Sequence, residues 1–185
     1  MPRDIVTTVY TFDELSEEAK ARAVATMADN LAGFWWDSSD NEEISDVIVH
    51  AFAATLLSPG HDTYGVADFP GINGVSLEEW ELDRRYLALR GTLTRENAPA
   101  LPWVEGIDVI RLHARRVYTD VETVLLDDAE ITRDDDIRIM KCVLDALRIA
   151  MAAAVAEYEY KTGEECARER CENGGYEFHA DGTLA

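Results

Sequence analysis

The sequence predicts an α+β fold, in which a small antiparallel sheet of about three or four strands packs with several helices. Segments with apolar residues at every second position alternate with segments whose apolar residues recur every three or four positions. An apolar fraction of 47% is enough for a sizeable core. The 185 residues therefore fit a single domain, with an α/β part at about 1–98 and a helical hairpin with a tail at about 103–185.

The first part of the chain predicts a strand followed by two helices. Residues 4–12 are rich in β-branched and aromatic side chains with a two-residue period, as in a half-buried strand. Ser16 is a suitable N-cap for a helix over 17–33, because two glutamates follow it where the helix dipole favours anions. A second helix begins near Asn41 and carries apolar residues at helical spacing as far as Leu56.

The middle of the chain predicts a loop and a pair of strands. Glycine and proline recur through residues 58–74, which is typical of a loop. Residues 75–83 and 85–94 have the alternation of strands and are close enough in sequence to pair as an antiparallel hairpin. A strict two-residue period places Leu77 and Trp80 on opposite faces of the first strand.

The strongest periodicity predicts a helical hairpin in the second half of the chain. Apolar residues step by three and four positions through residues 104–126, and again through residues 134–161. A polar stretch separates the two series, so we expect two antiparallel helices packed through their apolar stripes. The second stripe should be buried, and it consists of Ile137, Met140, Leu144, Leu147, Met151, Ala154 and Tyr158.

The charge balance argues against a general nucleic-acid-binding protein. The chain has 37 acidic and 17 basic residues, which gives a formal net charge of -20. Affinity for nucleic acid comes mostly from cationic contacts to phosphates, so direct binding to DNA or RNA is not expected. No apolar run reaches the roughly 20 residues of a membrane span, and the N-terminus lacks the apolar segment of a secretory signal. We therefore expect a cytoplasmic protein without a membrane partner, whose three cysteines stay reduced.

No known catalytic or phosphate-binding motif occurs in the sequence, so we predict a protein that is not an enzyme and binds no cofactor. Cys166, Cys171, His179 and Asp181 are residue types that bind metals. However, the five-residue spacing of the two cysteines directs them to different sides of a predicted helix. We therefore predict no metal site in this region.

Three consecutive aspartates, Asp134, Asp135 and Asp136, stand at the start of the longest predicted helix. Clustered carboxylates bind hard divalent cations, but the glycine and the closing glutamate of a calcium loop are missing. Acidic residues at a helix start are also stabilised by the helix dipole. We favour this second interpretation, under which the charges are still exposed to a protein partner.

Trp35 and Trp36 belong to a predicted aromatic break between the first two helices. Tryptophan is enriched at protein interfaces, so both residues are possible contacts with a partner. The alternative is that both cap the core between the two helices, because large aromatic side chains are usually buried.

Two stretches at the ends of the chain resemble a widespread family of uncharacterised bacteriophage proteins. The first, Val9 to Lys20, contains FDELSEEAK, and the second, Tyr158 to Glu165, is followed by YEFHADG at residues 176–182. The family opens with a strand and an FDELSEEAK-like helix start, and closes with a tyrosine-rich helix end, a short helix and a YEF-x-x-DG tail. The middle departs from the family, because GVSLEEW at residues 74–80 stands where members often have a glycine-rich QGDGA segment. The resemblance implies a phage origin and transfers no activity.

Charge and resemblance together lead to the main functional hypothesis. A small, strongly acidic phage protein is suited to inhibit a host nucleic-acid-binding defence system, as anti-CRISPR and anti-restriction proteins do. The expected partner is a host protein or complex in the host cytosol whose basic cleft is attracted to a fixed acidic face. The expected contact residues lie on the second helix and at the start of the longest one, and they are Glu42, Glu43, Asp46, Asp134, Asp135 and Asp136.

Two alternative functions stay open. One is a phage accessory or assembly protein whose charge serves solubility only. The other is a hydrolase with paired carboxylates, although no such pair can be located in the sequence. The sequence does not distinguish CRISPR from restriction or other targets, and it does not determine the oligomeric state.

Overall fold

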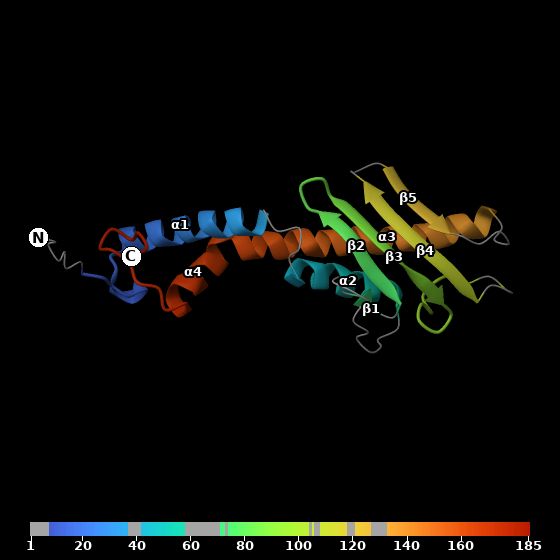
Figure 1. Ribbon diagram of the computed structural model, residues 1–185, viewed down its shortest axis with the longest axis horizontal. Coiled ribbons are helices and arrows are strands. Elements are labelled where there is room, and N and C mark those ends of the chain that lie inside the picture. The colour runs from blue at the N-terminus through green and yellow to red at the C-terminus, as the bar shows by residue number, and fades with distance from the viewer. Residues whose placement is uncertain are drawn as a thin grey trace, which may run out of the picture. The chain divides into compact units, whose positions relative to one another are not determined.

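A computed structural model of the chain contains helices and an antiparallel sheet, which confirms the α+β class (Figure 1). The structure describes residues 8–36, 42–57, 71–72, 74–103, 105, 108–117, 121–126 and 133–185. The chain divides into a terminal unit, Met1–Ser38 with Tyr158–Ala185, and a central unit, Ser39–Glu157. The single domain stays a prediction, because packing alone does not show whether the two units fold independently.

The terminal unit combines α1 (Glu17–Trp36), the last turn of α3 (Arg133–Thr162) and α4 (Glu164–Asn173). A short 3-10 helix, η1 (Phe12–Glu14), precedes α1. Helix α4 packs against α1 and also contacts η1. The buried apolar side chains of this unit are Phe12, Leu15, Ala19, Ala23, Val24, Met27, Leu31, Cys166, Ala167, Cys171 and Phe178.

The strand predicted over 4–12 appears among the described residues only as a bridge at Tyr10. The backbone N–H groups of Tyr10 and Phe178 each donate to the carbonyl oxygen of the other residue at 2.9 Å. Residues 4–7 lie outside the described part of the chain, and Phe12 already belongs to η1. The buried rings of Phe12 and Phe178 have their centroids 6.0 Å apart, so this bridge and ring contact join the two ends of the chain.

Both helices predicted in the first part of the chain are confirmed. The N–H of Ala19 donates to Ser16 Oγ at 3.2 Å, so Ser16 caps α1 as expected. Helix α1 continues through Trp36, and the predicted aromatic break is therefore wrong. The second predicted helix is α2 (Glu42–Leu56).

The central unit contains a five-stranded antiparallel sheet in which each strand pairs with its neighbours in sequence. The strands are β1 (Gly71–Ile72), β2 (Val75–Glu81), β3 (Tyr86–Thr94), β4 (Val109–Val117) and β5 (Val121–Leu126). Strands β2 and β3 confirm the predicted hairpin. The helix predicted over 104–126 is wrong, because this segment supplies β4 and β5. The predicted pairing of that helix with 134–161 is therefore wrong as well.

A β-bulge changes which side chains of β2 are buried. The register between β2 and β3 shifts between Leu77 and Glu79, which leaves Glu78 as an additional residue. An extra residue moves the following side chains to the other face of a strand. Trp80 is consequently buried together with Leu77, at 8% and 1% exposure, and the expected strict alternation is wrong after Leu77.

Helices α2 and α3 and one face of the sheet form the core of the central unit. In Figure 1, α3 runs behind the strands, and α2 lies against β1 and β2. Trp80 Nε1–H donates to Ser45 Oγ at 2.9 Å, which links β2 to α2 inside this core. Fully buried side chains of the core include Ile44, Ile48, Phe52, Leu77, Leu87, Leu89, Leu93, Ile110, Leu112, Ile139 and Leu147.

The buried face of α3 is rotated relative to the predicted stripe. Leu147, Met151 and Ala154 are buried as predicted. Ile137 is 37% exposed and Met140, Leu144 and Tyr158 are half-buried, so the prediction is wrong at these positions. Several adjacent sides of α3 are apolar, and the period therefore predicts the helix without determining which side packs inward. The positions buried instead are Ile139, Val143, Ala146 and Ala150.

Candidate protein-binding surface

The solvent side of α2 carries the first set of predicted contact residues. Glu42, Glu43 and Asp46 are all exposed at the start of this helix. Side chains three and four positions apart are neighbours on a helix, so Asp46 lies beside both glutamates. Neither Glu42 nor Asp46 forms an ion pair in the part of the chain that the structure describes. We refer to Glu42, Glu43 and Asp46 as the α2 acidic face.

The opposite side of α2 holds this face in position. Ile44, Ile48 and Phe52 are at most 1% exposed in the core of the central unit. Ser45, next to Ile44, is buried and accepts the hydrogen bond from Trp80. Folding therefore orders the backbone that carries the three carboxylates, and less conformational entropy is lost when they bind.

The aspartates at the start of α3 are in a different situation. Asp134 is exposed, whereas the side chain of Asp135 is only 17% exposed and forms an ion pair with Arg138. Asp136 lies in the first turn, and its side chain is outside the described part of the structure. All three positions are where the helix dipole stabilises negative charge. Glu42 and Glu43 lie in the first turn of α2 and share this stabilisation, so the ion pair and lower exposure of Asp135 are what distinguish the α3 cluster from the α2 acidic face.

The two acidic groups do not form one continuous surface. Figure 1 shows that α2 begins at one end of the central unit, whereas α3 begins at the other end. A partner of ordinary footprint, roughly 800 Å² on each side, would contact one group rather than both. The α2 acidic face is the better candidate for direct contact, because its carboxylates are all exposed.

The predicted aromatic contacts, Trp35 and Trp36, are the last two residues of α1. Their side chains lie outside the described part of the structure, so their role at an interface or in the core stays a prediction. Cys166 and Cys171 are both buried in α4 as free thiols, and burial raises the pKa of the Cys171 thiol. Among the described residues, no group of three or more histidine, cysteine, aspartate or glutamate side chains is arranged to hold a metal ion.

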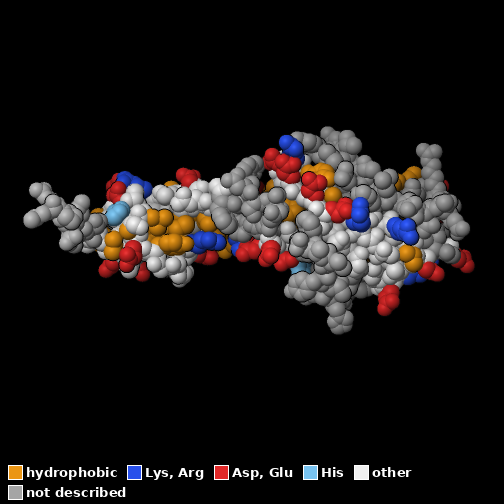
Figure 2. Space-filling view, in the orientation of Figure 1, with side chains coloured by type: hydrophobic (Ala, Val, Ile, Leu, Met, Phe, Trp, Pro, Cys, Tyr) orange, Lys and Arg blue, Asp and Glu red, His pale blue; other side chains and the backbone are white. Residues whose placement is uncertain are grey.

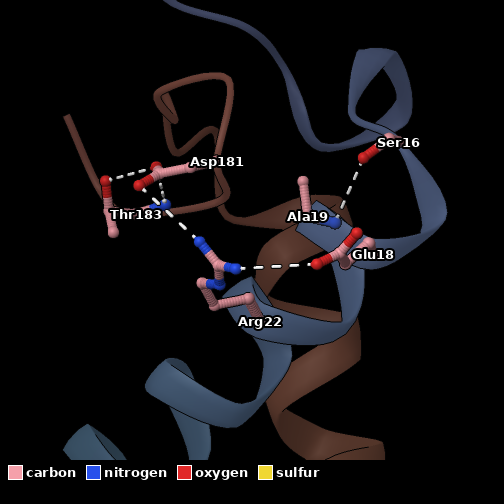
Figure 3. Close-up of polar contacts among 6 residues, drawn as sticks. All are labelled: Ser16, Glu18, Ala19, Arg22, Asp181 and Thr183. Atoms are coloured by element: carbon pink, nitrogen blue, oxygen red, sulfur yellow. Dashed lines mark hydrogen bonds and ion pairs between the residues drawn. The ribbon is translucent and has the colours of Figure 1, made fainter.

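The structure shows a polar cluster in the terminal unit that the sequence analysis did not predict (Figure 3). Arg22 of α1 forms ion pairs with Glu18 and with Asp181, each at 3.8 Å. Asp181 Oδ1 accepts hydrogen bonds from the backbone N–H of Thr183 at 3.0 Å and from its hydroxyl at 2.8 Å. The sequence Asp-Gly-Thr at 181–183 is the signal for this turn, because aspartate accepts from the backbone two residues later.

The turns of the terminal unit also shift the pKa values of their carboxylates. The N–H of Thr183, then its hydroxyl and the charge of Arg22, lower the pKa of Asp181. The N–H and hydroxyl of Thr11 likewise lower the pKa of Glu14, whose Oε2 they approach at 2.8 and 3.0 Å. Both shifts arise from hydrogen bonds that stabilise turns, so they indicate structure rather than acid–base catalysis.

The structure brings together the two end stretches that resemble the phage proteins. Tyr10 and Phe12 from the first stretch contact Phe178 from the second through the backbone bridge and the paired rings. Gly182 packs directly on the backbone of Ala19, where a Cβ would collide with the carbonyl oxygen. The two stretches are thus parts of one packed unit.

No family model, curated protein or solved structure matches this chain significantly. The phage resemblance therefore stays a prediction that depends on the two end stretches alone. Within the described residues, none of the helices has both the length and the apolar character required to cross a membrane.

Proposed function

We propose that the protein is a phage-encoded inhibitor that binds a basic, nucleic-acid-binding surface of a host defence protein in the host cytosol. The observation that supports this proposal is the α2 acidic face, in which three exposed carboxylates lie on a helix whose other side is locked into the core. Carboxylates held in this way can occupy lysine and arginine sites that otherwise bind phosphates. The partner then cannot engage its nucleic acid.

The net charge of -20 supports the same mechanism at longer range. A strong negative field attracts a basic cleft before contact and raises the association rate, most of all at low salt. The aspartates Asp134, Asp135 and Asp136 contribute to this attraction from the other end of the central unit. Their expected effect is on the rate of encounter, whereas the α2 acidic face also affects the lifetime of the complex.

The test is affinity capture from bacterial lysate with matched baits. One bait is the wild type, the second carries Glu42→Lys, Glu43→Lys and Asp46→Lys, and the third carries the same charge change on α4. The exposed residues Glu164, Glu165 and Glu172 supply that α4 control. We expect the wild type and the α4 variant to retain a nucleic-acid-binding protein that the α2 variant loses.

The captured protein must then be tested with its own nucleic acid. We expect added wild-type protein to displace the nucleic acid, and the α2 variant to fail at the same concentration. Capture of no nucleic-acid-binding protein, or equal capture by all three baits, would contradict the proposal. That result would favour an accessory protein whose charge serves solubility.

A further inference from the structure

Helix α4 of the terminal unit ends at Asn173, and Gly174 and Gly175 follow it. An asparagine before a glycine is chemically labile, because the glycine amide nitrogen can attack the side-chain amide carbon of the asparagine. Glycine has no Cβ that would hinder this approach. The new bond between nitrogen and carbon closes a succinimide ring, and ammonia leaves. Water then opens the ring and gives either aspartate or isoaspartate.

The packing of the terminal unit requires a glycine after Asn173. A Cβ at Gly174 would collide with the ring of Tyr176 and with the carbonyl oxygen of Arg170. Any other residue at 174 would therefore displace the Tyr176 ring or the end of α4. The glycine that makes Asn173 labile is thus a structural part of this turn.

The closed terminal unit holds both reacting groups in hydrogen bonds to the preceding turn of α4. The N–H of Gly174 donates to the carbonyl oxygen of Arg170 at 2.8 Å, and Asn173 Nδ2–H donates to the carbonyl oxygen of Glu169 at 3.1 Å. The Gly174 nitrogen must lose its proton before it attacks, and the bond to Arg170 keeps that proton in place. The intact helix end therefore opposes the reaction.

The site is open to water as soon as this helix end frays. Asn173, Gly174 and Gly175 are all exposed. Tyr176, whose ring packs on Gly174, is only two residues before Phe178, which forms the bridge and ring contact between the chain ends. Opening of the contacts at Phe178 therefore also releases the segment that packs on Gly174.

We propose that Asn173 is a deamidation site that the closed terminal unit protects, so that its modification records the opening of this unit. The rate of modification is then the rate in an unfolded peptide multiplied by the fraction of molecules that are open. This inference does not depend on the proposed function, because the α2 acidic face belongs to the central unit.

The reaction converts a transient opening into a lasting one. Isoaspartate adds one atom to the main chain before Gly174, which displaces its N–H from the carbonyl oxygen of Arg170. Both products also replace the amide donor of Asn173 by a carboxylate at the C-terminal end of a helix, where the dipole disfavours negative charge. Acidic side chains are already exposed on the terminal unit (Figure 2), and Glu169 and Glu172 lie within about one turn of Asn173.

The test is peptide mapping by mass spectrometry, which detects the replacement of the asparagine NH2 group by OH after incubation of the whole protein at neutral pH. A synthetic peptide of residues 172–178, ENGGYEF, gives the unprotected rate. The pair Asn73 and Gly74 is a second Asn-Gly sequence in the same chain and serves as the internal reference. Gly182→Ala opens the terminal unit, and Gly33→Ala is the control, because a Cβ at Gly33 meets nothing within 4 Å.

We expect Asn173 of the wild type to react at least about tenfold more slowly than the peptide. Gly182→Ala should raise the rate at Asn173 at least about threefold without changing the rate at Asn73, whereas Gly33→Ala should change neither. If thermal unfolding shows that Gly182→Ala is unfolded, Asp181→Asn replaces it, since that change removes only the polar turn.

Hydrogen exchange on the deamidated protein, separated by ion exchange, should show less protection in α1 and α4 than in the unmodified protein. Equal rates at Asn173 in the wild type and in the peptide would overturn the proposal. A rate at Asn173 that the terminal variant leaves unchanged, or raises only together with Asn73, would overturn it as well. Unchanged protection after deamidation would show that the opening is not made lasting.

Discussion

The terminal and central units differ in how their packed segments are connected. In the central unit, five strands follow one another in sequence, and each pairs with its neighbour. In the terminal unit, α1 and η1 pack against segments that come more than a hundred residues later, namely α4 and the bridge at Phe178. The terminal unit therefore closes only when both ends of the chain are present, whereas the central unit is one continuous segment.

This difference determines what each unit needs for stability. The central unit gains most of its order from an extended core between the sheet, α2 and α3. The terminal unit adds close backbone contact at Gly182 and the polar turn of Asp181 and Thr183 to a smaller core. Closing a long loop has an entropy cost, so the contacts between the chain ends are expected to be the first to open.

Replacing one buried phenylalanine in each unit tests whether the units are separate. Phe52 and Phe178 are 1% and 0% exposed. Alanine at either position should lower the free energy of unfolding of its unit by about 3–5 kcal/mol. Hydrogen exchange should show the loss of protection within α2 and the sheet for Phe52→Ala, and within α1 and α4 for Phe178→Ala. Loss in both units from either change would show one cooperative domain instead.

Leucines on neighbouring positions of α3 test the rotated stripe of the central unit. Leu147 is completely buried, and Leu144 is half-buried. We expect Leu147→Ala to lower the free energy of unfolding by about 2–4 kcal/mol and Leu144→Ala by about half as much. Folding buries less of the apolar side chain at Leu144, so less stabilisation is lost when it is removed. Urea unfolding measures both values. Equal losses would mean that the side of α3 that packs on the sheet is assigned incorrectly.

Two glycines with positive φ test the close contact in the terminal unit. A Cβ added at Gly182, where φ is +89°, would collide with the carbonyl oxygen of Ala19, whereas a Cβ added at Gly175, where φ is +67°, would meet nothing within 4 Å. Alanine at Gly175 should cost about 1 kcal/mol from the backbone conformation alone. Alanine at Gly182 adds a collision with the backbone, so thermal unfolding of the terminal unit should show at least twice that loss. Similar losses at the two glycines would contradict the packing at Ala19.

The smallest expected effect is a pH dependence confined to the terminal unit. The pKa of Asp181 is lowered in the folded protein. Its contribution to stability is therefore complete above the unfolded pKa and is lost as the pH falls through the folded pKa. Asp181→Asn should flatten the acid side of the stability profile, below the usual aspartate range of roughly 3.5–4. Asp29→Asn is the control for the loss of one negative charge. If Asp181→Asn leaves the pH profile of stability unchanged, the turn at Asp181 does not contribute to the pH dependence.

Local sequence patterns predicted elements whose partners are near in sequence. The helices α1 and α2 and the hairpin of β2 and β3 were predicted because cap, period and turn signals all lie within each segment. The contact of Tyr10 with Phe178 could not be predicted in this way, since neither segment has a period long enough to indicate its partner. The bulge at Glu78 was also hidden, because it depends on the register with β3.

The segment 104–126 shows how two periods can coexist in one sequence. Its apolar residues fit steps of three and four, but Ile110, Arg111 and Leu112 also alternate as buried, exposed and buried. Pairing of β4 with β3 from Leu87 to Thr94 supplies the backbone hydrogen bonds that a helix would otherwise form internally. Non-local pairing therefore decided between the two periods. The exposed carboxylates of the α2 acidic face were predicted correctly as exposed, because they depend on the local period of α2 alone.

The most direct test of the proposed function is the association rate constant with the identified host partner, measured by stopped flow at two salt concentrations. The proteins to compare are the wild type, the α2 variant at Glu42, Glu43 and Asp46, and the α4 control with the same charge change. We predict that the α2 variant associates at least about tenfold more slowly, with a weaker salt dependence, while the control changes much less. Equal slowing of both variants would show that net charge acts without a defined site, and it would contradict a contact through the α2 acidic face.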